Sequence, residues 1–159
     1  GLVGADYTVA GIGRVQCGVV NAILTDYWNN GGLVTVNAHF ANPQTGGNAK
    51  DGTINFTDLT TPGTPLYNQW HAVLDQVAAG FQELEDAGVI VLWRPFHEMN
   101  GGWFWWGNRD ANEFKTAWIQ MHEYLTDTKG LANLIWVYSP SARDNVTTYY
   151  PGDHYVDFV

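Results

Sequence analysis

The sequence predicts an α/β fold with a parallel sheet, organised as part of a (β/α)8 barrel in a single domain over residues 1–159. Short runs rich in Val, Ile, Leu and Thr alternate with segments whose apolar residues recur every three or four positions, as expected of βα units. The predicted helix-to-strand turns are short, whereas strand-to-helix loops are long, notably 40–63 and 95–110. Barrels build their active face from loops that follow the strands. A doubly wound open sheet is the alternative, but no glycine-rich phosphate fingerprint follows any predicted strand.

The first third of the chain predicts a strand, a helix and a second strand. Residues 2–6 form the first short strand, and apolar residues at helical spacing predict a helix over 15–28. Gly31 and Gly32 end that helix, because glycine readily adopts the backbone conformation that terminates helices. Residues 33–39, rich in Val and Thr, form the second strand.

The second βα unit begins with a recognisable helix start. Thr64 is placed as N-cap and Pro65 at the first helical position, where the missing N–H costs nothing. Gly88 ends this helix. Residues 89–94 are nearly all apolar, which predicts a strand covered on both faces.

The last third predicts one more helix and two strands. Asp110 and Glu113 resemble a capping box, with Asp in place of Ser or Thr, at the start of a helix that ends before Gly130. Residues 133–138 form the fourth strand, and residues 155–159 form a fifth.

The remaining connection and the chain ends shape the domain prediction. Residues 139–154 are too few for a full helix with its loops, so this unit is expected to be irregular. The last residues read as a strand that stops midway, which predicts that the chain is an internal fragment of a longer domain. The single cysteine, Cys17, excludes an internal disulfide framework.

Composition excludes two classes of partner. The formal net charge of −9 and the pI near 4.6 argue against nucleic acid, whose phosphates would be repelled. No apolar run approaches the roughly 18–20 residues needed to span a bilayer, so no membrane partner is expected. Eight Trp, eight Tyr and seven Phe suit either an aromatic core or a site that stacks on sugar rings, and composition leaves both open.

The segment 93–107 carries the chemistry. A predicted buried strand ends in the pair His97 and Glu98, and an aromatic loop that includes Trp103 follows. A carboxyl walled by indoles is desolvated, which favours the protonated form that a general acid needs. The structural alternative is a helix-capping acid among core tryptophans. Four aromatics in a glycine-flanked loop would be costly to bury entirely, so we expect this loop to be partly exposed.

Histidine spacing gives no metal site. A helical zinc motif needs a second histidine four residues after His97, where Gly101 stands instead. His39 ends a predicted strand on the same edge as Glu98, so we expect it to line the site. The other histidines share no ligand spacing; they are His71, His122 and His154. No metal and no cofactor are predicted.

The central motif resembles the acid/base signature of glycoside hydrolase family 26. It reads Trp93-Arg94-Pro95-Phe96-His97-Glu98-Met99-Asn100-Gly101, followed by Trp103-Phe104-Trp105-Trp106-Gly107. Supporting matches occur in family order at Gly32 to His39 with Asn42-Pro43, at Ile135 to Pro140, and at Tyr150 to Asp153 with Tyr155-Val156-Asp157. The family consists mainly of endo-β-1,4-mannanases, with some β-1,3-xylanases and lichenases. The resemblance implies a (β/α)8 (TIM) barrel, of which this chain covers about strands 2 to 6.

The resemblance also implies roles for individual residues. Glu98 would be the catalytic acid/base, and His97 would orient the carboxylates and the sugar at the cleavage point. Trp103 would be a sugar platform, and His39 and Tyr138 would line the cleft. The family's nucleophile is a second Glu near the end of the seventh strand, beyond the end of this sequence. Retaining hydrolysis needs two carboxyl groups about 5–5.5 Å apart, so the fragment alone is expected to be inactive.

The function implied is a retaining, endo-acting glycoside hydrolase that cleaves β-1,4-mannan-type polysaccharide: mannan, galactomannan or glucomannan. Such a substrate implies a secreted or periplasmic enzyme. The alternatives are a β-1,3-xylanase or mixed-linkage glucanase of the same family, or a non-catalytic carbohydrate-binding module. Glu98 set between His97 and Trp103 would favour catalysis, whereas tryptophans in an exposed flat row would favour binding alone.

Overall fold

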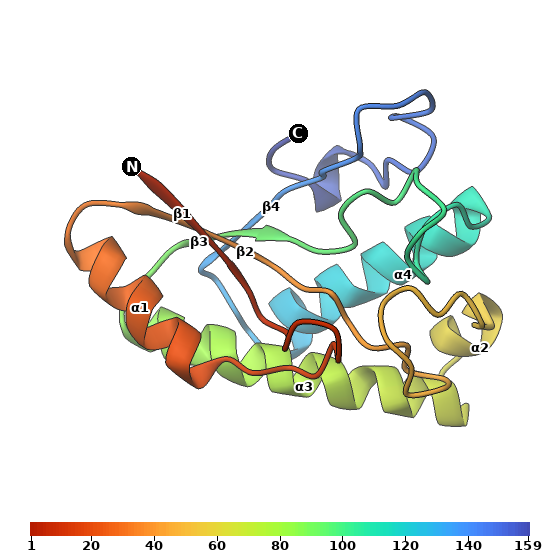
Figure 1. Ribbon diagram of the computed structural model, residues 1–159, viewed down its shortest axis with the longest axis horizontal. Coiled ribbons are helices and arrows are strands. Elements are labelled where there is room, and N and C mark those ends of the chain that lie inside the picture. Colours follow the sequence, from red (N-terminus) through yellow and green to blue (C-terminus); the bar gives the residue numbers. More distant parts are fainter.

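The computed structural model describes residues 1–159, and its centre is a four-stranded parallel sheet (Figure 1). The strands are β1 (Leu2–Asp6), β2 (Leu33–Asn37), β3 (Val91–Arg94) and β4 (Leu134–Trp136). They lie in the order β1-β2-β3-β4, and every neighbouring pair is parallel. Sequential neighbours joined by helices are the arrangement of a (β/α)8 barrel, so the predicted fold class is confirmed.

The prediction of a fifth strand over residues 155–159 is wrong, because only one residue there pairs with the sheet. Residues Asp153–Tyr155 form a 3-10 turn, and the only strand-like pairing after it is a single parallel bridge between Val137 and Phe158. The Asp157 carboxylate accepts the Trp136 backbone N–H at 2.8 Å. The Asp157 side chain therefore occupies a backbone N–H that a fifth strand would have bonded through its own carbonyl group. This explains why the pairing is limited to one bridge.

The three long helices cover one face of the sheet. They are α1 (Gly18–Asn29), α3 (Pro65–Asp86) and α4 (Ala111–Glu123), and in Figure 1 they lie below the strands. Alternate strand residues point at these helices and are buried; they are Val34, Val36, Val91, Trp93 and Trp136. This alternation gives each strand one covered face.

The opposite face of the sheet is open. Leu2, Leu33 and Ile90 are exposed on or beside it by 61, 55 and 46%. The expectation that residues 89–94 are covered on both faces is therefore wrong within this chain, where Leu92 and Arg94 are only half-buried. A barrel wall has helices on its outer face and apolar side chains on its inner face. The side chains of the other strands pack against that inner face in a closed barrel.

Helix ends follow the predicted chemistry, with one difference. The Thr64 hydroxyl caps α3 by accepting the Tyr67 N–H at 3.1 Å. The Asp110 carboxylate caps α4 by accepting the N–H groups of Asn112 and Glu113. The Glu113 side chain does not reach back to complete a capping box but accepts the Thr57 hydroxyl at 3.0 Å.

Two short elements were not predicted from the sequence. Helix α2 (Phe56–Thr60) lies inside the long loop 40–63 and is capped by Asn55, whose side chain accepts the Asp58 N–H. Helix α4 continues into a π-helical turn over Tyr124–Thr128 before Gly130. None of the helices is long and apolar enough to cross a membrane.

Candidate active site

The site is centred on the turn that follows β3. Phe96 and Glu98 both have positive φ angles, 47° and 57°, which are uncommon for residues other than glycine and cost backbone energy. The Glu98 N–H donates to the Ser139 carbonyl at 2.7 Å, which ties the turn to the segment after β4. The strained turn therefore presents Glu98 at the carboxyl edge of the sheet, as predicted.

An indole N–H holds the Glu98 carboxylate. Trp103 Nε1 donates to Glu98 Oε2 at 2.8 Å, and both side chains are half-buried. Gly101 makes this pairing possible, because a Cβ there would lie 2.3 Å from the Trp103 ring. The carboxylate thus has a fixed position beside an aromatic ring that solvent still reaches.

The rest of the aromatic loop is a scaffold. Trp106 Nε1 donates to the His97 carbonyl, and Trp105 Nε1 donates to the Phe40 carbonyl, each at 2.9 Å. Phe104 is 9% exposed, and Trp105 and Trp106 are fully buried. Among the aromatic residues of this loop, only Trp103 is appreciably exposed, so the loop does not form the flat exposed row that a simple binding module would present.

Three side chains from neighbouring strand ends form a hydrogen-bonded row. His97 Nε2 lies 3.2 Å from His39 Nε2, and His39 Nδ1 pairs with Asp6 Oδ2. Asp6 also accepts the Thr8 backbone N–H at 2.8 Å and the Asn37 amide at 3.0 Å. Burial raises the pKa of Asp6, but the hydrogen bonds from Thr8 and His39 outweigh it and lower that pKa overall.

His97 is the buried member of this row. Burial, reinforced by the neighbouring His39 and Arg94, lowers the pKa of His97 to about 4, so its ring is neutral near neutral pH. The contact between the two Nε2 atoms needs one donor and one acceptor, so the protonation of His39 decides which nitrogen of the neutral His97 ring carries the proton. His97 Nδ1 is buried without a hydrogen-bond partner.

Sequence reasoning named His39 and His97 but gave Asp6 no role. The available signal is register: Asp6 pairs with Asn37 and Asn37 with Arg94, so all three reach the same sheet edge. A carboxylate at the end of a strand adjoining that of His39 is well placed to fix the imidazole tautomer.

Tyr138 lies near the end of β4 but is turned into the core. It is 2% exposed, and its hydroxyl donates to the Val146 carbonyl at 2.7 Å. Burial raises its pKa to about 12. The structure thus brings Glu98, Trp103, His97 and His39 to one edge but leaves the Tyr138 hydroxyl occupied, and its role in substrate binding stays a prediction.

Two hollows flank this edge. One, of about 520 Å³, is lined by Asp6, Thr8, His39, Lys50 and Phe104 among others. The second, of about 630 Å³, is lined by Asn100 and residues 142–145. No three His, Cys, Asp or Glu side chains lie close enough together to hold a metal ion. A long ligand suits two separate hollows near an ordered carboxylate.

The parallel sheet and the position of Glu98 define the class of protein: a barrel-type α/β domain with a carboxyl group at the carboxyl ends of its strands. The chain belongs to glycosyl hydrolase family 26, whose sequence profile matches residues 2–159.

Named relatives share much of the sequence. A mannan endo-1,4-beta-mannosidase (A and B) of Caldalkalibacillus mannanilyticus is 47% identical over 152 residues, which cover 87% of this chain and 30% of the relative. The mannan endo-1,4-beta-mannosidase of Bacillus subtilis strain 168 is 44% identical over 151 residues, covering 87% and 42%.

Solved structures agree with the fold. A Bacillus subtilis mannanase superposes with a TM-score of 0.89 at 38% identity, covering 98% of this chain and 52% of that chain. A β-mannanase from a symbiotic protist of the termite Reticulitermes speratus, complexed with gluco-manno-oligosaccharide, gives 0.84 at 29% identity, covering 98% and 52%. This chain therefore spans about half the length of these structures.

Proposed function

We propose that this chain supplies the acid/base part of a retaining, endo-acting β-1,4-mannanase. The observation that carries the proposal is the position of Glu98, which is fixed by a strained turn and by the Trp103 N–H beside the Asp6–His39–His97 row. Relatives named as mannan endo-1,4-beta-mannosidases, 44 to 47% identical to this chain, support the choice of mannan.

In the proposed reaction Glu98 acts twice. It first donates a proton to the glycosidic oxygen as the bond to the departing sugar breaks. It then removes a proton from the water that cleaves the glycosyl-enzyme intermediate. The neutral His97 ring is proposed to help orient the catalytic carboxylates and the sugar at the cleavage point, from its place at the end of the row with His39 and Asp6.

The nucleophile is proposed to be a second carboxylate from another part of the family fold. Asp6 is the other acid at this edge, but His39, Thr8 and Asn37 all engage it. A carboxylate held by several donors is a weak nucleophile and a good charge partner for His39. The matched solved structures are about twice as long as this chain, so a nucleophile can lie in the part of the family fold outside it.

The proposed substrates are mannan, galactomannan and glucomannan, and the proposed location is secreted or periplasmic because such polymers lie outside cells. A β-1,3-xylanase or a mixed-linkage glucanase is the alternative activity. An endoglucanase H of Acetivibrio thermocellus, 33% identical over 88 residues, keeps the glucanase alternative open. Hydrolysis rates on mannan, β-1,3-xylan and mixed-linkage glucan would separate these activities.

The test uses Glu98→Gln in the full-length protein that carries this chain. The substitution keeps the shape but removes the transferable proton, so mannan hydrolysis should fall about 10²–10⁴-fold. An aryl β-mannobioside has a good leaving group and should still form the intermediate, giving a burst followed by a slow steady rate. Azide should restore turnover by attacking without a base and should yield a β-configured glycosyl azide.

The matched control is Glu123→Gln, which makes the same chemical change at an exposed position on α4. It should leave every rate near that of the unsubstituted protein. Mannan hydrolysis by Glu98→Gln at the unsubstituted rate would show that Glu98 is only structural and would overturn the proposal.

A further inference from the structure

Arg143 lies next to the acid group without an ionic partner of its own. Its guanidinium carbon is 4.9 Å from the centre of the Trp103 ring, and the same indole donates to Glu98. Arg143 is exposed, and its guanidinium forms neither a salt bridge nor a hydrogen bond within the chain. Five N–H donors are therefore free over the indole that holds Glu98.

The segment that carries Arg143 is attached to the turn that carries Glu98. The Asn100 amide oxygen accepts the Ser141 N–H at 2.8 Å, and its NH2 group donates to the Ser141 carbonyl at 3.0 Å. The same NH2 group lies 3.4 Å from the Asp144 carbonyl. Arg94 adds a hydrogen bond to the Ser139 hydroxyl at 3.0 Å. These contacts fix the base of the segment relative to Glu98 and Trp103.

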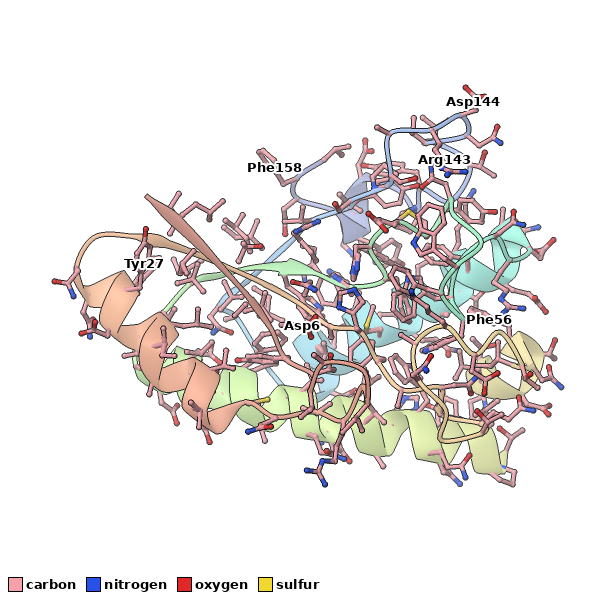
Figure 2. All side chains as sticks on the ribbon, viewed as in Figure 1. Asp6, Tyr27, Phe56, Arg143, Asp144 and Phe158 are labelled. Carbon is pink, nitrogen blue, oxygen red and sulfur yellow. The ribbon has the colours of Figure 1, made fainter.

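Beyond this attachment lies the polar hollow of about 630 Å³, lined by Asn100, Ala142, Arg143, Asp144 and Asn145. Figure 2 shows Arg143 and Asp144 on the projecting loop after β4, well separated from Asp6 at the end of β1. The hollow beside Asp6 and His39 is thus a different one. One hollow therefore lies beside Asp6 and His39, and the other beside Asn100 and Arg143.

We infer that the Arg143 hollow binds the departing part of the substrate, and that Arg143 is a specificity-determining residue there. This inference rests on the proposed function. In the free protein the guanidinium covers the Trp103 ring. A sugar ring of the departing chain replaces it on the indole, and the guanidinium then donates to hydroxyl groups of that sugar. Hydrogen bonds from a charged donor contribute more than an exposed cation–π contact, so the exchange favours binding.

This arrangement distinguishes two kinds of substrate. A β-1,4-linked hexose chain continues past the cleaved bond and places hydroxyl groups in the hollow. An aryl β-mannobioside places a flat ring without such hydroxyls next to Trp103. Arg143 should therefore matter for the oligosaccharide and little for the aryl glycoside.

The test compares Arg143→Ala and Arg143→Lys with the unsubstituted full-length protein on both substrates. For a β-1,4-mannopentaose, Arg143→Ala should lower kcat/KM about tenfold through KM, the loss expected when one or two hydrogen bonds from a charged donor disappear. For the aryl β-mannobioside the change should stay within about twofold. Arg143→Lys keeps the charge without the planar fork and should be intermediate.

The charge control is Lys115→Ala on α4, a half-exposed cation that forms no ion pair. It should leave both substrates unaffected, and thermal unfolding should be unchanged in all variants because Arg143 is exposed. Equal losses on both substrates, or none, from Arg143→Ala would overturn this inference while leaving the proposed function standing. An unsubstituted protein that hydrolyses neither substrate would overturn the proposed function and this inference together.

Discussion

At the scale of single residues, burial decides how the site's ionisable groups behave. His97 is 6% exposed and neutral, whereas Asp6 stays ionised because several donors hold its carboxylate. The row therefore has a charged carboxylate at one end and an uncharged imidazole ring at the other.

His97 predicts a pH dependence of stability. Its pKa is about 4 in the folded protein, against about 6.5 for an ordinary histidine. Between these values the unfolded chain binds a proton that the folded protein does not, so stability is complete above pH 6.5 and falls as the pH drops towards 4. The loss from this group is at most about 3 kcal/mol.

His97→Gln removes this titration while keeping a polar side chain. Urea unfolding of the full-length protein at pH 7 and at pH 4.5 should show a smaller loss of stability for the variant than for the unsubstituted protein. The variant should be less stable at pH 7, since the row with His39 is broken. An identical loss in both proteins between the two pH values would contradict the burial of a neutral His97.

At the scale of elements, helix caps are the most local feature of this fold. Asp110 begins α4 by accepting two backbone N–H groups, those of Asn112 and Glu113. Asp110→Ala should therefore lower the free energy of unfolding by about 1 kcal/mol. Glu123→Ala, at the other end of α4, removes the same charge where no cap exists and should not destabilise. Chemical unfolding of both variants in the full-length protein checks the difference.

The same elements show what the sequence could predict. The starts of two helices could be predicted from Thr64-Pro65 and from Asp110, because a helix cap depends on a few adjacent residues. Both predicted helices were confirmed. The prediction of the fifth strand was wrong because the pairing there depends on a hydrogen bond from the Trp136 N–H to Asp157, two residues 21 positions apart in the sequence. The short helix α2 was not predicted, because five residues are too few to show a helical period of apolar residues.

The site divides in the same way. Residues at strand ends, such as His39 and Glu98, follow from the alternation of strands and loops. The burial of Trp105 and Trp106 does not, because it depends on contacts with Phe40, Trp70 and Phe96 from three separate segments. The position of Arg143 over Trp103 joins two loops that are 40 residues apart, and nothing in either loop alone predicts it.

At the scale of the whole molecule, the dominant feature is a sheet with one uncovered face. Leu2, Leu33 and Phe158 are exposed by 61, 55 and 61%, and Figure 2 shows Phe158 on the side away from α1 and α3. Apolar side chains in such a group are covered by further strands in a closed barrel. The free edge of β1 adds unpaired backbone groups that can pair with another chain.

This face predicts opposite effects of one substitution in two settings. Residues 1–159 expressed alone should self-associate, because apolar strands and a free edge are exposed despite the net charge of −9. Leu33→Lys should reduce that association, since it places a charge in the exposed group. In the full-length protein the same change should destabilise the fold, because a lysine would lie where the barrel interior excludes water.

Sedimentation velocity of the isolated chain and thermal unfolding of the full-length protein measure the two effects. Ile12→Lys is the control, because Ile12 is 60% exposed but lies in the loop between β1 and α1, away from the sheet face. It should change neither measurement appreciably. A monomeric isolated chain with one cooperative unfolding transition would contradict the expected exposure, since a sheet that is stable with this face in water has no need of covering strands.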